Sequence, residues 1–120
     1  MKILITARTP TMEGEVDPRF GRAAWFVVID TETGEFRGVD NDQNLNALQG
    51  AGIQAAQHAL DQGVEAILTG HCGPKAFRVL SQAGIAVYTG VDGSVAEALE
   101  RFRSGTLSPI ARPDVDGHWQ

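Results

Sequence analysis

The 120-residue sequence has a single cysteine, Cys72. One thiol cannot form a disulfide within the chain, and it cannot complete an all-cysteine zinc site or a conventional four-cysteine iron–sulfur site. These sites are therefore excluded within one chain. The lack of an internal disulfide fits a reducing compartment, and we expect a cytoplasmic protein.

Long apolar runs and an excess of positive charge are also missing. No apolar run approaches the roughly 20 residues that a membrane helix needs, and no basic segment followed by an apolar one opens the chain. We therefore expect no membrane partner and no secretory signal. The formal net charge of −5 argues against nucleic acid as a partner, because phosphates are normally neutralised by a basic face.

The pattern of apolar residues predicts one α/β domain over residues 1–105, followed by an extended tail over residues 106–120. Expected strands cover residues 2–7, 23–30, 35–40, 64–68 and 84–88. Helices are expected after residues 50–52, from Pro74 and from Ser94. An antiparallel hairpin followed by crossover units gives a three-layer α/β/α fold with a mixed five-stranded sheet.

Several details of these elements are predicted as well. The first helix should bury Ile53, Ala56 and Leu60 and turn His58 to solvent. Ser94 and Glu97 form a capping-box pattern at the start of the last helix. Strand 35–40 is more polar and should lie at an edge of the sheet, where it could pair with another chain. We expect Trp25 in the core, and the tail docked through Ile110 or Trp119.

The stretch Thr69-Gly-His-Cys-Gly-Pro-Lys-Ala76 lies where a strand turns into a helix, at the sheet edge where α/β proteins place their chemistry. Cys72 and His71 are candidate ligands of a metal or its sulfides, and Cys72 is also a candidate nucleophile whose pKa the helix N-terminus would lower. The alternative is that Cys72 is a small buried apolar residue. Adjacent side chains point apart, so both could enter one pocket only on an irregular backbone.

Glycines and cationic residues gather at the same edge. Four glycines in the connections to helices permit either close approach of a ligand or merely tight turns: Gly50, Gly52, Gly70 and Gly73. Four basic residues, in or beside the loops at this end, are candidates for binding an anion: Arg8, Arg19, Arg22 and Lys75. The long loop over residues 8–21 also carries Glu13, Glu15 and Asp17, and ion pairs with these carboxylates are the alternative use of the arginines.

Two sets of motifs occur together in this chain: Asp17-Pro-Arg-Phe-Gly-Arg-Ala23, and Gly50-Ala-Gly52 followed by Gly63-Val64, Gly70-His-Cys-Gly-Pro-Lys-Ala76 and Gly84-Ile85. In this combination the chain resembles the dinitrogenase iron-molybdenum cofactor biosynthesis family, from about Lys2 to Phe102. The resemblance implies a ribonuclease-H-like α/β/α fold that carries or binds metal–sulfur clusters. In its length and single cysteine, the chain is most similar to small standalone members of the family from sulfate-reducing bacteria. Those proteins hold a molybdenum–copper sulfide cluster without covalent attachment.

The resemblance implies a non-enzymatic carrier or storage protein for such a cluster, or for a precursor of the iron–molybdenum type. An anionic cluster that brings its own sulfides needs only N–H donors, cations and a cavity from the protein. A thiol-dependent enzyme acting on an anionic substrate through Cys72 remains an alternative. So does a cofactor-free domain that docks on a nucleotide-driven partner protein. Nuclease activity is not expected, because strand 2–7 lacks the carboxylates of a two-metal site.

Overall fold

The structure is a computed structural model that describes residues 1–41 and 51–112. Within these residues, eight elements follow one another in the order expected from the sequence. The strands are β1 (Lys2–Ala7), β2 (Trp25–Asp30), β3 (Phe36–Asp40), β4 (Ala66–Leu68) and β5 (Ala86–Tyr88). The helices are α2 (Ala51–Asp61), α3 (Pro74–Gln82) and α4 (Val95–Arg103).

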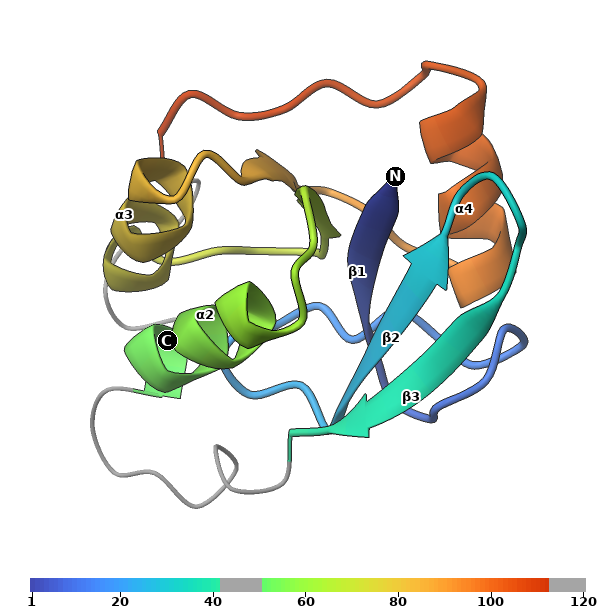
Figure 1. Ribbon diagram of the computed structural model, residues 1–120, viewed down its shortest axis with the longest axis horizontal. Helices are drawn as coiled ribbons and strands as arrows, with labels where there is room; N and C mark the ends of the chain where they lie inside the picture. Colours follow the sequence, from blue (N-terminus) through green and yellow to red (C-terminus); the bar gives the residue numbers. More distant parts are fainter. Residues whose placement is uncertain (42–50, 113–120) are drawn as a thin grey trace.

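The five strands form one mixed sheet in the order β3-β2-β1-β4-β5, which confirms the expected fold class. β1, β2 and β3 pair in antiparallel fashion, whereas β4 is parallel to both β1 and β5. Helices α2 and α3 lie on one face of the sheet and α4 lies on the other (Figure 1). We call these the helix-pair face and the α4 face.

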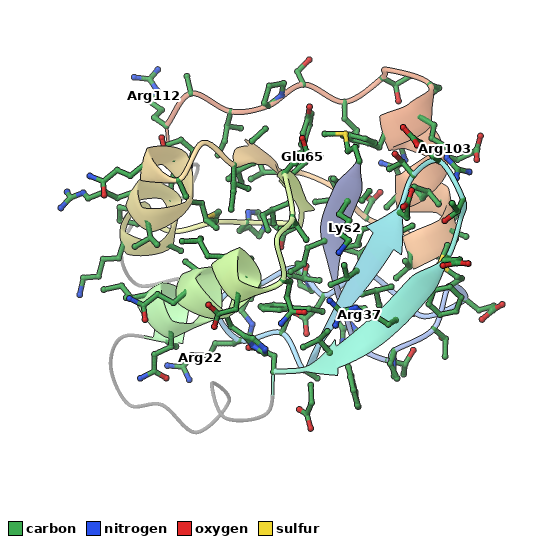
Figure 2. The ribbon with its side chains drawn as sticks, viewed as in Figure 1. Lys2, Arg22, Arg37, Glu65, Arg103 and Arg112 are labelled. Atoms are coloured by element: carbon green, nitrogen blue, oxygen red, sulfur yellow. The ribbon has the colours of Figure 1, made fainter. Side chains whose placement is uncertain are left out.

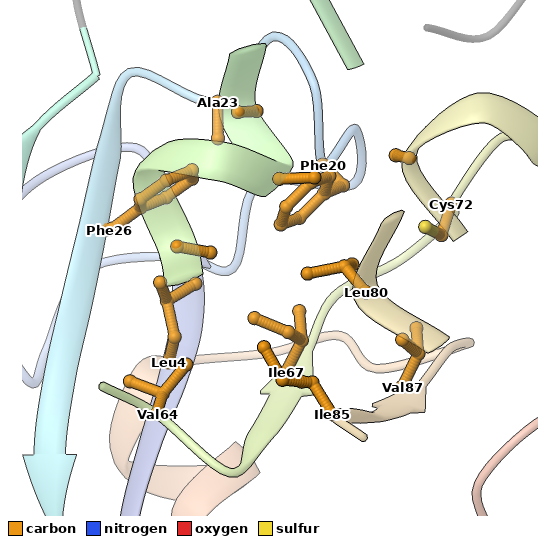
Figure 3. Packing of buried hydrophobic residues seen from close by; sticks show 14 of the residues in the cluster. Leu4, Phe20, Ala23, Phe26, Val64, Ile67, Cys72, Leu80, Ile85 and Val87 are labelled. Carbon is orange, nitrogen blue, oxygen red and sulfur yellow. The ribbon is translucent and has the colours of Figure 1, made fainter. Parts of the chain in front are cut away.

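Alternation along β1 divides the core between the two faces. Leu4 belongs to the hydrophobic cluster beneath α2 and α3, and Ile3 and Ile5 belong to the cluster beneath α4. The helix-pair cluster also contains Phe20, Phe26, Cys72 and Leu80 (Figure 3). Because β1 is buried on both faces from Ile3 to Ala7, exposed polar side chains near this central strand come from its ends and the adjoining loops.

The buried face of α2 differs from the expectation. Its buried residues are small ones, namely Ala51, Gly52, Ala55, Ala56 and Ala59. Ile53 and Leu60, which were expected to face the core with Ala56, are only half-buried. Small side chains let α2 approach α3 and the sheet closely, and the bulky residues then fall at the margin of the contact.

His58 was predicted to face solvent, and this prediction is wrong. The imidazole is half-buried, and its ring centroid lies 5.4 Å from that of Phe26. Its Nδ1 is 3.4 Å from Oδ1 of Asn41, a buried residue whose Nδ2 donates to the carbonyl of Ala23. His58 therefore links α2 to the end of β3 and the start of β2.

Caps and the chain after α4 follow the sequence pattern. The hydroxyl of Ser94 accepts from the N–H of Glu97, whose carboxylate accepts from the N–H of Ser94, which completes the expected capping box. Beyond α4, the N–H of Ile110 donates to the carbonyl of Val87 at 2.8 Å, and the Ile110 side chain packs against the helix-pair cluster. Trp119 lies outside the described residues. None of the described helices has the length and apolar character that crossing a membrane requires.

Candidate functional site

Three loops meet at the carboxyl ends of the parallel strands β1, β4 and β5. They cover residues 8–21, 69–73 and 89–94, and we call this surface the rim. Backbone hydrogen bonds join the first loop to the third, where Val16 donates to Gly93 and Val95 donates to Gly14, both at 2.9 Å. The N–H of Gly90 donates to the carbonyl of Gly70 at 2.8 Å, which joins the third loop to the second. The rim is therefore a hydrogen-bonded assembly of all three loops.

Two buried threonines anchor the rim to the sheet. Thr6, near the end of β1, and Thr69, directly after β4, are completely buried, and their hydroxyls are hydrogen-bonded to each other at 2.8 Å. The Thr6 hydroxyl also donates to the carbonyl of Asp17 at 2.7 Å, while the N–H of Asp17 donates to the carbonyl of Thr6 at 2.9 Å. Polar groups this deep are stabilising only when paired, so the network fixes the position of the loop at Asp17.

The loop beyond Asp17 runs alongside the loop after β4. The N–H of His71 donates to the carbonyl of Pro18 at 2.7 Å, and the N–H of Phe20 donates to the carbonyl of His71 at 3.2 Å. These bonds form an isolated parallel bridge that pairs Arg19 with His71. Arg19 is exposed and His71 is half-buried. The structure thus brings together two predicted site residues from loops that are distant in the sequence.

Gly70 is required by packing within the protein. A Cβ atom placed on Gly70 would lie 2.6 Å from both the Cα and the carbonyl oxygen of Pro18, closer than real Cβ contacts come. The sequence leaves two roles open for this glycine, close approach of a ligand and a tight turn, and the structure adds a third. Gly70 allows the two loops of the rim to approach each other.

Cys72 points into the core. Its side chain is 1% exposed and belongs to the helix-pair cluster, with Phe20, Ala76 and Leu80 as fellow members (Figure 3). Its Sγ lies 3.8 Å from the carbonyl oxygen of Gly73. The neighbouring imidazole of His71 is half-buried, so the two adjacent residues differ in exposure, as expected of residues that point apart.

The other predicted site residues are spread more widely. Gly73 is the N-cap of α3, in extended conformation, and Lys75 is exposed in the first turn of that helix. Gly52 is buried in the first turn of α2, and Arg22 is half-buried just before β2. Arg8 is exposed, with its Nε 3.8 Å from Oε2 of Glu15. Gly50 lies outside the described residues.

Three carboxylates on the rim, those of Glu15, Asp17 and Asp92, have partners within the protein. Glu15 is paired with Arg8, and Oδ1 of Asp92 lies 2.8 Å from the Arg101 guanidinium. Oδ1 of Asp17 accepts the backbone N–H of Arg19 at 3.1 Å. Glu15 and Asp92 are therefore paired with arginines, whereas the Asp17 carboxylate accepts a backbone N–H and keeps its negative charge next to Arg19.

A comparison with known protein families identifies the family to which this chain is related. The family model described as dinitrogenase iron-molybdenum cofactor matches residues 1–105, most of the chain. The chain belongs to this family. The resemblance read from the glycine motifs is thereby confirmed.

Relatives of known structure agree with this assignment. The apo form of the orange protein from Desulfovibrio gigas is 43% identical, with a TM-score of 0.93 over 95% of this chain and 96% of that one. A putative NifB protein from Thermotoga is 31% identical, with a TM-score of 0.78 over 90% and 91% of the two chains. The uncharacterized protein MJ0580 of Methanocaldococcus jannaschii is 32% identical over 87% of this chain and 90% of its own length. The family relation fits a protein that handles a metal cofactor.

Two surface cavities lie in other parts of the molecule. One, of about 180 Å³, lies on β1, β2, β3 and the turn between β2 and β3, and it is lined by Lys2, Val28, Asp30, Glu35, Phe36 and Arg37. The other, of about 260 Å³, lies along α2 and is lined by Gln54, Gln57, His58 and Asp61. Neither has a predicted site residue in its lining. In the described parts of the chain, no three His, Cys, Asp or Glu side chains gather in a way that could hold a metal ion.

Sequence reasoning missed the residues that build the rim without being exposed on it. Thr6 comes one residue before the end of the expected strand 2–7, and Thr69 directly follows the expected strand 64–68. A polar residue at the end of an apolar strand is a signal that could have indicated both. The partner of Gly70, Pro18, carried no signal, because the contact joins two loops that only the folded sheet brings together.

Proposed function

We propose that this protein is a non-enzymatic carrier that holds an anionic molybdenum-containing sulfide cluster, of the molybdenum–copper type, at the rim. The observation that carries the proposal is the bridge between Arg19 and His71. It places a guanidinium and an imidazole on neighbouring loops, with Lys75 in the first turn of α3, whose helix dipole also favours negative charge. Residues 8–21 and 69–73 form the floor on which the cluster rests.

The donor set fits a preformed cluster better than a bare metal ion. A bare ion needs several protein ligands, and the described residues offer no cluster of three. A sulfide cluster brings its ligands with it and needs from the protein only N–H donors and cations that balance its charge. Non-covalent attachment therefore suits this surface.

In this proposal Cys72 supports the floor and does not ligate. Its side chain is 1% exposed inside an apolar cluster, so the sulfur would have to leave the core before it could reach a cluster on the rim. The same burial weighs against the alternative of a thiol-dependent enzyme, since a nucleophile must reach its substrate. We assign contacts with the cluster to Arg19, His71 and Lys75, with Arg22, Gly73, Gly52, Gly50 and Arg8 as further candidates.

The test is anaerobic loading of the apo-protein with tetrathiomolybdate, with and without copper(I), followed by desalting, visible absorption and metal analysis. We expect absorption bands that co-elute with the protein at a fixed ratio of molybdenum to protein. Arg19→Ala should weaken retention of the colour, because it removes a cation from the proposed floor. Arg37→Ala is the matched control, since it removes the same charge from β3, outside the three loops of the rim.

The outcomes separate the parts of the proposal. Cys72→Ala should load as the wild type does, and loss of loading in that variant with intact folding would contradict the supporting role of Cys72. Wild-type protein that elutes colourless and free of metal would overturn the carrier function. Equal loss of colour in Arg19→Ala and Arg37→Ala would show attraction by overall charge and would remove the rim as the site.

A further inference from the structure

The two edges of the sheet are treated differently. The edge strand β5 receives a backbone hydrogen bond from Ile110, so the chain after α4 covers part of that edge. At the opposite edge lies β3, which has β2 as its one neighbouring strand within residues 1–41 and 51–112. Figure 1 shows β3 beside β2, as the last strand at this end of the sheet. An edge strand of this kind presents a row of backbone donors and acceptors for another strand.

The pairing with β2 determines which backbone groups of β3 point outward. The N–H of Asp30 donates to the carbonyl of Glu35 at 2.9 Å, so the polar backbone groups of Glu35 are directed at β2. Because direction alternates along an antiparallel strand, the groups of Arg37 and Val39 also face β2, and those of Phe36, Gly38 and Asp40 face outward. Phe36 and Gly38 are exposed.

Side chains at this edge are of two kinds, one on each face. Arg37 is paired with Val28 and belongs to the helix-pair face, where Glu35 also lies, and both line the cavity of about 180 Å³ (Figure 2 labels Arg37). Phe36 is paired with Ile29 and belongs to the α4 face. Phe36 is 46% exposed, and among the described residues Met1 is the other large hydrophobic side chain with comparable exposure.

We propose that β3 pairs in antiparallel fashion with β3 of a second copy of this chain, about a two-fold axis that passes through Phe36. An axis perpendicular to the sheet keeps each face on the same side, so paired residues come from the same face. In this register Phe36 lies opposite Phe36 of the second copy, and Glu35 lies opposite Arg37. Symmetry repeats the Glu35–Arg37 pair, which gives two ion pairs on one face and an aromatic pair on the other.

The neighbouring registers are less favourable. A shift that centres the pair on Arg37 places two guanidinium groups directly opposite each other, and like charges in that position are destabilising. A shift that centres it on Gly38 places Phe36 opposite Asp40 and removes Glu35 from Arg37. Charge complementarity therefore selects both a second copy as the partner and the register about Phe36. So short an interface predicts a weak, concentration-dependent dimer.

The test is sedimentation equilibrium of the full chain from about 10 μM to about 1 mM. We expect the wild type to dimerise within this range. Glu35→Arg and Arg37→Glu should each raise the dissociation constant by about tenfold or more, because each variant puts two pairs of like charges across the interface. An equimolar mixture of the two variants should form a heterodimer, since every pair across the interface then joins an arginine to a glutamate. Lys2→Glu is the matched control and should dimerise as the wild type does, because it makes the same charge change in the same cavity on β1.

Either of two results overturns the proposal. A wild-type chain that stays monomeric at about 1 mM would show that β3 does not pair with a second copy, and a strand from a different protein would become the partner to test. Variants that dimerise equally well, or whose mixture gives no heterodimer, show that the contact uses another surface. Circular dichroism and thermal unfolding of each variant confirm that a lost dimer does not reflect a lost fold.

Discussion

The N–H of His71 donates a hydrogen bond to the carbonyl oxygen of Pro18 at 2.7 Å, and this bond joins the loop after β1 to the loop after β4. It brings Arg19 beside His71 in a parallel bridge. The placement of a guanidinium beside an imidazole on the rim is therefore a product of loop pairing, and it depends on the contact that Gly70 allows with Pro18. Residues that control this contact should control any ligand binding at the rim.

Gly70→Ala tests this contact. A methyl group on Gly70 would lie 2.6 Å from backbone atoms of Pro18, which cannot move as a flexible side chain can. We expect the free energy of unfolding to fall by about 1–3 kcal/mol, as for other overpacked sites. Hydrogen exchange should show faster exchange at the His71 amide, because the two loops are pushed apart.

Gly63→Ala is the control for this variant. Gly63 has a φ of 70°, and a methyl group on it would meet no atom within 4 Å beyond its chain neighbours, so alanine there introduces backbone strain without a clash. Gly63→Ala should lower stability and leave the relative protection of the His71 amide as it is. Unchanged protection of that amide in Gly70→Ala would contradict the role of the Pro18 contact.

Thr6→Val should loosen the loop at Asp17. The variant keeps the shape of the side chain and leaves the Asp17 carbonyl and the Thr69 hydroxyl each without one hydrogen-bond partner. We expect a loss of about 1–3 kcal/mol in the free energy of unfolding, measured by urea denaturation. Thr6→Ser retains the hydroxyl and should lose less. In a double-mutant cycle, Thr6→Val and Thr69→Val should cost less together than the sum of the two, and strict additivity would show that the hydroxyls do not interact.

Most of the fold could be predicted from the sequence, because the strands carry strong local signals. Runs such as that of β1 are apolar on both faces, and Ser94 and Glu97 mark the start of α4. The buried face of α2 could not be predicted in the same way. Its contacts are made by alanine and glycine, whose weak apolar signal was outweighed by Ile53 and Leu60.

The site was predictable only in part. The position of the motif Thr69–Ala76 after a buried strand placed His71 and Cys72 at the rim, and the tendency of adjacent residues to point apart agrees with their different exposure. Which of the two residues points inward could not be predicted, because the burial of Cys72 depends on packing with Phe20 and Leu80, which come from separate parts of the chain. His58 was misplaced for a similar reason, since Phe26 and Asn41 cover it from β2 and from the residue after β3.

Cys72 should react slowly in the native protein. Its side chain is 1% exposed, so an alkylating reagent can reach the thiol only after local or global opening. Because such an opening costs several kcal/mol, we expect the rate with iodoacetamide to be at least about a hundredfold lower in buffer than in urea. Mass spectrometry of the intact chain measures both rates. Comparable rates would mean that the thiol visits the surface readily, and they would restore Cys72 as a candidate ligand or nucleophile.

The capping box of α4 should make stability depend on pH in acid. The backbone N–H and the hydroxyl of Ser94 hold the pKa of Glu97 below its ordinary value of 4.5. A carboxyl group with a lowered folded-state pKa contributes stability that is fully present above the unfolded pKa and is lost as the pH falls through the folded pKa. The free energy of unfolding should therefore decrease as the pH is lowered below about 4.5.

Glu97→Gln should be less stable than the wild type at neutral pH, and the difference should shrink in acid. Asp30→Asn is the comparison, since the N–H groups of Glu32 and Thr33 lower the pKa of Asp30 outside the capping box, in a turn that contacts α4 through Arg103 at the other end of the helix from Ser94. A gap between wild type and Glu97→Gln that stays constant as the pH falls would show that the charged form of Glu97 is not what stabilises the cap.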